Sequence, residues 1–158
     1  MKAKEGVIDL LNKILTNELT AINQYFVHAK MCDNWGYARL AHKIHHFSID
    51  EMKDADKTIA HILYLEGIPN MQRLGTVHVG ETAQEQLKLA LKQEQDAVKL
   101  FREAITHCAK VEDYTTRHLL EEMVVDEEHH IDWLETQLET IEQIGLENYL
   151  GQQIKKDS

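Results

Sequence analysis

The stretch that decides the fold is "DEEHH" at 126–130, which has a near copy, "DEMKD", at 50–54. Glu127 precedes His130 by three residues, and Glu51 precedes Asp54 by the same distance. Residues three apart lie on one face of an α-helix, so each stretch presents two potential metal ligands together. The two stretches therefore indicate facing helices around a shared site.

The composition is typical of one helical domain, which we expect to span residues 1–158. The chain has one proline and seven glycines, with 43% hydrophobic and 28% charged residues. A formal charge of −10 argues against nucleic-acid binding and suits cations. The two cysteines make no disulfide framework, no apolar run reaches membrane-spanning length, and the first residues contain no signal-peptide core. We therefore expect a cytoplasmic protein without a membrane partner.

Apolar residues at helical spacing predict four long helices, over about 5–34, 34–65, 83–111 and 114–143. Asn34 is the expected cap of the second helix, and Thr82 with Glu85 fits a capping box before the third. Gly145 ends the fourth helix, and the tail "LENYLGQQI" predicts a short fifth. The segment 67–81 spans roughly 50 Å when extended, and each long helix spans roughly 43 Å. The predicted fold is therefore all-α, a four-helix bundle with a long crossover between helices two and three.

An offset of 76 residues relates the two halves of the chain. It carries Glu18 onto Glu94, Glu51 onto Glu127 and Asp54 onto His130. The two helical hairpins are therefore expected to be copies related by an approximate two-fold axis. All four glutamates fall on the apolar stripes of their helices. Buried carboxylates in such numbers repel one another unless a cation lies between them.

The ligand types identify the cation. A glutamate from each of two helices, with Glu-x-x-His from each of the other two, is the ligand set of a carboxylate-bridged di-iron site. Carboxylate and imidazole ligands suit iron. The predicted ligands, which would also be the catalytic residues, are Glu18, Glu51, Glu94, Glu127 and His130. Tyr25 lies two turns after Glu18 on the same face, where it either donates a hydrogen bond near the metals or packs in the core.

Five stretches of the chain resemble bacterioferritin: "NELTAINQYFVHAKM", "SIDEMKDAD", "ILYLEGIPN", "DEEHHIDWLETQL" and "IGLENYL". The resemblance covers essentially the whole length. It implies a ferritin-like fold and a cytoplasmic cage of twenty-four subunits around an iron mineral. It also implies a di-iron ferroxidase centre in each subunit, haem b at two-fold interfaces, and an electron donor for iron release.

The resemblance also assigns roles by position. It gives iron ligation to the five predicted ligands, and it places Asp54 where the family has a histidine. It places the haem-ligating methionine at Met52 and an iron site of the cavity wall at His46 and Asp50. Position 47, commonly acidic in the family, is Phe47, a difference that bears on how iron enters the cavity.

Met52 lies about 100° around its helix from the preceding glutamate, so it leaves the core stripe. With Ile49 and Ile59, and with Leu19 and Phe26 of the first helix, it forms a second apolar stripe that a symmetric dimer would bury. The residues alone favour an adaptable interface role for Met52. The resemblance favours a haem ligand shared between two chains.

Three functions fit these observations. The leading hypothesis is a ferroxidase that stores iron. The second is a haem-binding shell subunit of a mixed cage, whose own centre is impaired by Asp54 and which relies on a second subunit type. The third is a di-iron peroxidase of the rubrerythrin kind, but such proteins usually carry a four-cysteine module, and this chain has two well-separated cysteines.

Asp54 predicts an asymmetric centre in either of two ways. If its shorter side chain reaches the metal, it adds a fifth acid and favours Fe(III) over Fe(II). If it falls short, that metal keeps water in the gap and binds loosely. In both cases the metal beside His130 is the better held.

Overall fold

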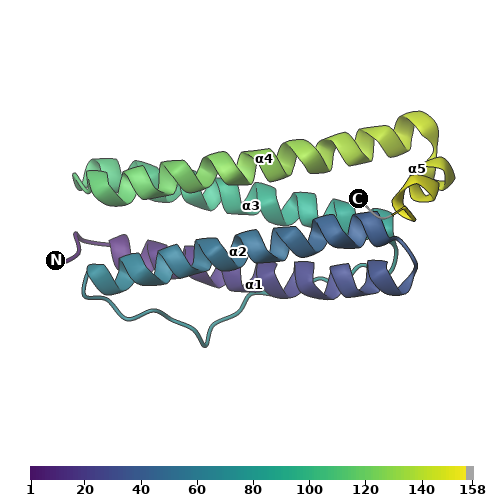
Figure 1. Cartoon of the computed structure of the whole chain (residues 1–158). Coiled ribbons are helices and arrows are strands. Elements are labelled where there is room, and N and C mark those ends of the chain that lie inside the picture. Colours follow the sequence, from purple (N-terminus) through teal and green to yellow (C-terminus); the bar gives the residue numbers. More distant parts are fainter. Residues whose placement is uncertain (156–158) are drawn as a thin grey trace.

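The structure, a computed structural model, describes residues 1–155 and consists of helices joined by loops (Figure 1). The last three residues of the predicted domain, 156–158, lie outside the described part. The helices are α1 (Val7–Asn34), α2 (Ala38–Tyr64), α3 (Ala83–Lys110), α4 (Tyr114–Ile144) and α5 (Leu146–Gln153). The predicted all-α bundle, its crossover and its short fifth helix are therefore confirmed.

Two of the predicted helix starts can be compared with the structure. Asn34 does not cap α2, because it is the last residue of α1. The chain turns instead at Gly36, whose φ of 89° is accessible to glycine at little cost. Thr82 caps α3 as predicted, since its side chain accepts from the Glu85 N–H at 3.1 Å. Glu85 itself accepts from the Glu81 N–H rather than from that of Thr82.

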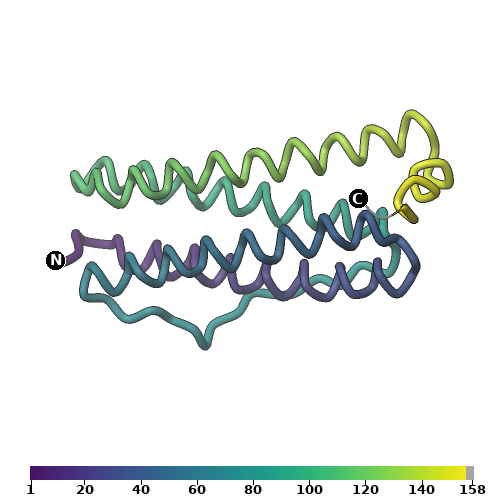
Figure 2. The backbone as a smooth tube through the Cα atoms, viewed as in Figure 1, coloured from purple at the N-terminus to yellow at the C-terminus, as the bar shows by residue number. Residues whose placement is uncertain are grey.

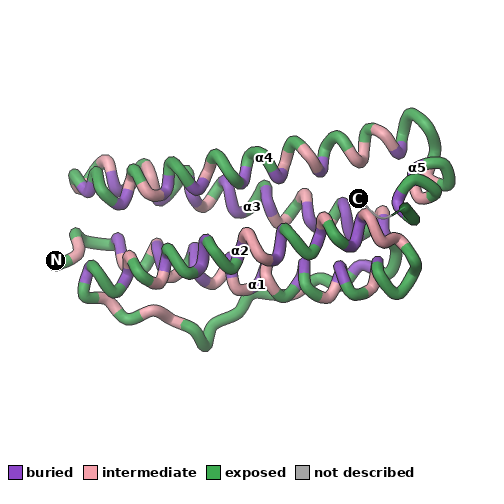
Figure 3. Tube along the Cα trace, viewed as in Figure 1, coloured by how far each residue is buried: buried purple, intermediate pink, exposed green. Residues whose placement is uncertain are grey.

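A layer of polar residues divides the core of the bundle. One apolar cluster gathers residues from Ala21 to Cys32 of α1 with the beginnings of α2 and α3. The other gathers residues from Val7 to Leu15 with the ends of α2 and α3. The buried acids lie between these clusters, midway along the bundle, and the buried positions follow the inner faces of all four long helices (Figure 3). Apolar packing on both sides therefore holds the acids in the interior.

The crossover between α2 and α3 runs alongside α1 (Figure 2) and is bonded to it. Five polar residues of α1, spaced by four, form a polar ladder that makes these hydrogen bonds. They are Asn12, Thr16, Thr20, Gln24 and His28, and they bond in order to Asn70, Arg73, Gly75, His78 and Gly80. Burial lowers the pKa of His28 to about 4, so its neutral ring can accept the bond from the Gly80 N–H. The described helices include none that is long and apolar enough to cross a membrane.

Candidate metal centre

The five predicted di-iron ligands and Asp54 all reach the middle of the bundle. Glu18 comes from α1 and Glu94 from α3, while α2 and α4 each supply a pair at i and i+3. All six side chains are buried, with exposed fractions between 1% and 7%: Glu18, Glu51, Asp54, Glu94, Glu127 and His130. Such burial of five acids and one imidazole is costly unless cations compensate it.

The six side chains form two overlapping ligand groups. The His130 group contains Glu51, Glu94, Glu127 and His130, with one ligand atom from each lying within 4.8 Å of all the others. The Asp54 group contains Glu18, Glu51 and Asp54, by the same measure. Glu51 belongs to both groups, whereas Glu127, its mate in the sequence repeat, belongs to one. The centre is therefore asymmetric, with four ligands on one side and three on the other.

Several buried ligand atoms have no hydrogen-bond partner, which tests whether metal ions fit. They are both carboxylate oxygens of Glu18, one oxygen each of Glu94 and Glu127, and Nδ1 of His130. Buried polar atoms are nearly always paired in folded proteins. Oxygen and imidazole ligand atoms that converge from four helices match the requirements of iron ions. The residues present therefore fit a pair of iron ions.

The electrostatics agree with this fit. Burial raises the pKa of Glu51 well above its ordinary value, and the charges of Glu94, Glu18 and Asp54 raise it further. Burial, with the charge of Asp54, does the same for Glu18. The pKa of Asp54 rises to about 6, again mainly through burial. Without metal these carboxyls resist ionisation, and bound cations would reverse the effect.

His130 is held in an orientation that suits a ligand. Its Nε2 lies 3.1 Å from Oδ2 of Asp50, which leaves Nδ1 facing the centre, 3.6 Å from Oε1 of Glu94. Metal-bound histidines commonly donate their second N–H to a carboxylate in this way. Burial lowers the pKa of His130, but the charges of Glu94 and Asp50 and the hydrogen bond to Asp50 outweigh it and leave the pKa raised.

Aromatic contacts fix the same ring. Phe47 stacks on His130 with centroids 4.1 Å apart, and it packs edge-on against Tyr25 and Trp133. Phe47 thus puts a packing surface against the imidazole. The hydroxyl of Tyr25 donates to Oε1 of Glu94. Of the two roles predicted for Tyr25, hydrogen-bond donation and core packing, the structure therefore shows the first. The repeat mate of Tyr25 is Phe101, which has no hydroxyl to donate.

The cavity-wall site expected at His46 and Asp50 stays a prediction. Asp50 bonds to His130, and the exposed His46 ring packs edge-on against His42, with centroids 4.6 Å apart. Neither residue falls in a group of three or more potential metal ligands among residues 1–155.

Met52 lies on the surface, as predicted, and is 50% exposed. Phe26 on the neighbouring helix is 51% exposed, whereas Leu19 and Ile59 pack partly into the core. An exposed thioether can ligate a haem only if a second molecule closes the site. Haem binding through Met52 therefore depends on the assembly of two copies of the chain through this face.

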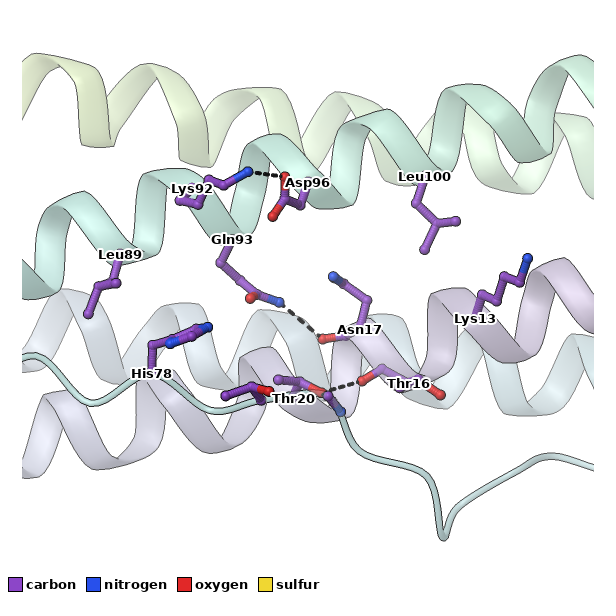
Figure 4. Close-up of a pocket in the computed structure, with 12 residues that line it drawn as sticks. Lys13, Thr16, Asn17, Thr20, His78, Leu89, Lys92, Gln93, Asp96 and Leu100 are labelled. Carbon is purple, nitrogen blue, oxygen red and sulfur yellow. Dashed lines mark hydrogen bonds and ion pairs between the residues drawn. The ribbon is translucent and has the colours of Figure 1, made fainter.

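Pockets lie on two sides of the bundle. One, of about 320 Å³, lies between α2 and α4, and its lining includes Asp54 and His130. Another, of about 580 Å³, lies between α1, α3 and the crossover (Figure 4). There Gln93 donates to the carbonyl oxygen of Asn17 at 3.4 Å, and each of these residues immediately precedes a glutamate ligand.

Comparison with known proteins agrees with the fold. The ferritin-like domain matches residues 8–144 of the chain. Bacterioferritin BfrA of Mycobacterium tuberculosis is 45% identical over 156 residues, which cover 99% of this chain and 98% of the relative. The chain belongs to the bacterioferritin family. The bacterioferritin of Rhodobacter capsulatus is also 45% identical, over 94% of this chain and 92% of its own, and that of Brucella melitensis is 44% identical over the same shares.

The structure also shows two contacts of His130, with Asp50 and with Phe47, that the sequence patterns did not indicate. Asp50 was predicted as a cavity-wall ligand, yet it contacts His130, and Phe47 was noted only as a departure from the family. The 76-residue offset contained one clue, because it pairs Asp50 with Asp126 just as it pairs the ligands. Nothing in the sequence indicated that Phe47 would stack on an imidazole one helix away.

Proposed function

We propose that this member of the bacterioferritin family stores iron by oxidising Fe(II) at its own di-iron centre. The observation that carries the proposal is the set of buried, unpartnered oxygens and one nitrogen that converge from four helices. Family membership supports iron as the metal. Two Fe(II) ions each lose one electron to dioxygen or peroxide, and the Fe(III) products move to a mineral store.

Each residue of the centre has a distinct part in this proposal. Glu51 would contact both ions, since it belongs to both ligand groups. His130 would bind one ion through Nδ1 while its Nε2–H donates to Asp50. The surrounding apolar clusters limit water around the carboxylates, which strengthens their attraction for cations.

We extend the proposal to assembly and to haem b. The exposed stripe that contains Met52 and Phe26 suits a two-fold interface. Two copies of Met52 across that axis can supply both thioether ligands of a shared haem, which would carry electrons. The proposal includes a twenty-four-subunit cytoplasmic cage and an electron donor for iron release, both of which family membership supports. Light scattering tests assembly, and a stable monomer at micromolar concentration contradicts it. Met52→Leu should abolish a low-spin b-type spectrum without dissolving the cage.

Stopped-flow oxidation of Fe(II) by the pure homopolymer tests the central proposal. We expect a rapid phase that saturates at two Fe(II) per subunit. Asp54→His should raise the rate of that phase several-fold, because an imidazole completes the three-ligand side. A wild-type protein without any rapid phase contradicts ferroxidase activity of its own.

The three-ligand Asp54 group favours one alternative, a haem-binding shell subunit in a mixed cage. In that case the homopolymer lacks the rapid phase, Asp54→His creates it, and a second subunit type restores it when the two are co-assembled. Equal rapid phases in wild type and Asp54→His would show that Asp54 replaces the imidazole fully and would exclude the impaired centre.

A further inference from the structure

Helix α2 holds the His130 imidazole at two places. Phe47 stacks on the face of the ring, with centroids 4.1 Å apart and planes inclined by 25°. Asp50 contacts the edge of the ring, with Oδ2 3.1 Å from Nε2. Because Phe47 and Asp50 lie three residues apart on one helix, both can reach the same ring. The imidazole can therefore turn away from the centre only by leaving the stack and the hydrogen bond together.

Phe47 is itself fixed by its neighbours. Its side chain is buried, and it packs edge-on against Tyr25 and Trp133, with centroids 5.5 Å and 5.3 Å apart. The ammonium group of Lys43 lies 5.5 Å from the centroids of both Phe47 and Trp133. Edge-on ring pairs and cations over ring faces are attractive. Phe47 therefore presents a surface of fixed position to the imidazole.

The stacked rings lie between the buried ligands and the pocket of about 320 Å³. Phe47, His130 and Asp50 all line this pocket. Nδ1 of His130 points the other way, because it is buried and lies 3.6 Å from Oε1 of Glu94. An ion bound at Nδ1 would thus lie behind the imidazole. The ring must move before such an ion can pass it into the pocket.

The other half of the centre has a methionine where this half has Phe47. The 76-residue offset that carries Asp54 onto His130 also carries Phe47 onto Met123. Both residues are buried, but a thioether chain is flexible and has no ring face to stack on a ligand. Asp54 lines the same pocket without a ring of its own. The two halves therefore differ in how firmly a ligand at the pocket wall is held.

We propose that Phe47 is a positioning residue, which holds His130 on its metal ion and slows the departure of that ion from the centre. Release from the His130 side is then slower than release from the Asp54 side. This inference rests on the proposed function, since the ion held by His130 is one of the di-iron pair. It gives position 47 a part in how long iron stays at the centre.

Release of Co(II) from the loaded, assembled protein to excess EDTA tests this role, with stopped-flow visible absorption as the readout. No oxidant is present, so release is separated from turnover. We expect a fast and a slow phase in wild type, and loss of the slow phase in His130→Ala. Phe47→Met introduces the residue of the other half and keeps a similar volume. It should bind two Co(II) per subunit, as wild type does, and release the slow one about ten-fold faster.

Two further variants separate the stack from general packing of the core. Phe47→Tyr keeps the ring and should release Co(II) at the wild-type rates. Met123→Leu is the matched control, because it changes the buried repeat mate of Phe47, and it should leave the slow phase unchanged.

The possible results distinguish this inference from the proposed function. An unchanged slow phase in Phe47→Met would overturn the positioning role, as would release of both ions in a single wild-type phase. An equal acceleration in Phe47→Tyr or Met123→Leu would overturn it too, by showing that any change in the core loosens the ion. No bound Co(II) in wild type would overturn the proposed function itself.

Discussion

The His130 half and the Asp54 half of the centre derive from one repeat but differ in how completely they are built. The His130 half has four ligands, a hydroxyl that donates to Glu94, and an aspartate that orients the imidazole. The Asp54 half has three ligands, and both oxygens of Glu18 lack partners. Where the first half has Tyr25, the second has Phe101.

This difference shows that two copies of a repeat can keep the same burial of their ligands while the hydrogen-bonding groups around those ligands differ. Glu18 and Glu94 are 2% and 1% exposed, so the packing of the two hairpins has stayed alike. The hydrogen-bonding groups around them have not. Tyr25 and Asp50 bond to ligands on the His130 side, whereas both carboxylate oxygens of Glu18 lack partners. The two halves should therefore respond differently to substitution.

Removal of the shared ligand should disable both halves and give the largest effect. Glu51→Gln keeps the volume of the side chain but loses the charge that both metals use. We expect about a thousand-fold loss of the rapid iron-oxidation rate, beyond the roughly 10- to 100-fold typical of outer-shell changes. Stopped-flow absorbance measures the rate, and light scattering verifies the cage. A loss below ten-fold would show that Glu51 is not shared.

The halves can be compared directly through His130→Ala and Asp54→Ala. We expect about a hundred-fold loss of the rapid phase for His130→Ala and less than ten-fold for Asp54→Ala, because Asp54 belongs to the weaker group. Anaerobic Fe(II) titration should show one tight ion lost in the first variant and one weak ion lost in the second. Equal losses would make the centre symmetric in function.

Asp50→Asn tests whether orientation of the imidazole distinguishes the halves. The amide cannot accept as strongly from His130, so metal affinity in that half should fall about ten-fold. The signals of His130 in NMR spectra of the Zn(II)-loaded protein should shift as well. If Asp50 acts instead with His46, then His46→Ala reproduces the loss and the His130 signals stay in place.

The smallest expected effect concerns the stability of the metal-free protein as a function of pH. Burial raises the folded-state pKa of Asp54 to about 6, above the ordinary value of 3.8. The folded state therefore binds this proton more tightly than the unfolded state, and stability falls as pH rises from about 4 to about 6. Because Asp54 lines an open pocket, we expect Asp54→Asn to recover on the order of 1 kcal/mol at pH 7.

Thermal unfolding of the metal-free protein at pH 4.5 and pH 7 measures this effect. His130→Ala serves as the comparison from the other half, since the pKa of His130 is raised by Glu94 and Asp50. That variant should lose more stability at the lower pH, where the imidazolium is formed. The same pH response in both variants would contradict the assignment of opposite charge preferences to the two halves.

Much of the fold and the ligand set could be predicted from sequence because both follow from periodicity. The spacing of Glu18, Glu51, Glu94 and Glu127 on apolar stripes requires them to meet inside a bundle. The stack of Phe47 on His130 could not be predicted, because it depends on side-chain rotamers and on the distance between two helices. The sharing of Glu51 alone, rather than of both repeat mates, likewise depends on small displacements.

The polar ladder could have been found in the sequence, because its residues recur every four positions. The apolar stripe of the same helix predicts its core side and does not indicate which segment the polar face contacts. The start of α2 was misplaced for a similar reason. Asn34 is a good cap in isolation, but Gly36 adopts the positive φ that ends α1.

The spacing of the polar ladder also sets a direction of winding. Four residues of an α-helix advance by about 40° beyond one full turn, so the steps from Asn12 to His28 add up to about 160°. The crossover is bonded to these residues and therefore passes nearly half-way round α1. Helix α1 contacts both α2 and α3. A ladder that alternated spacings of three and four would run almost straight and return the chain to the flank it left. The spacing of polar residues in α1 therefore determines the path by which the crossover joins the two hairpins, although the crossover runs from α2 to α3 and α1 is neither of its ends.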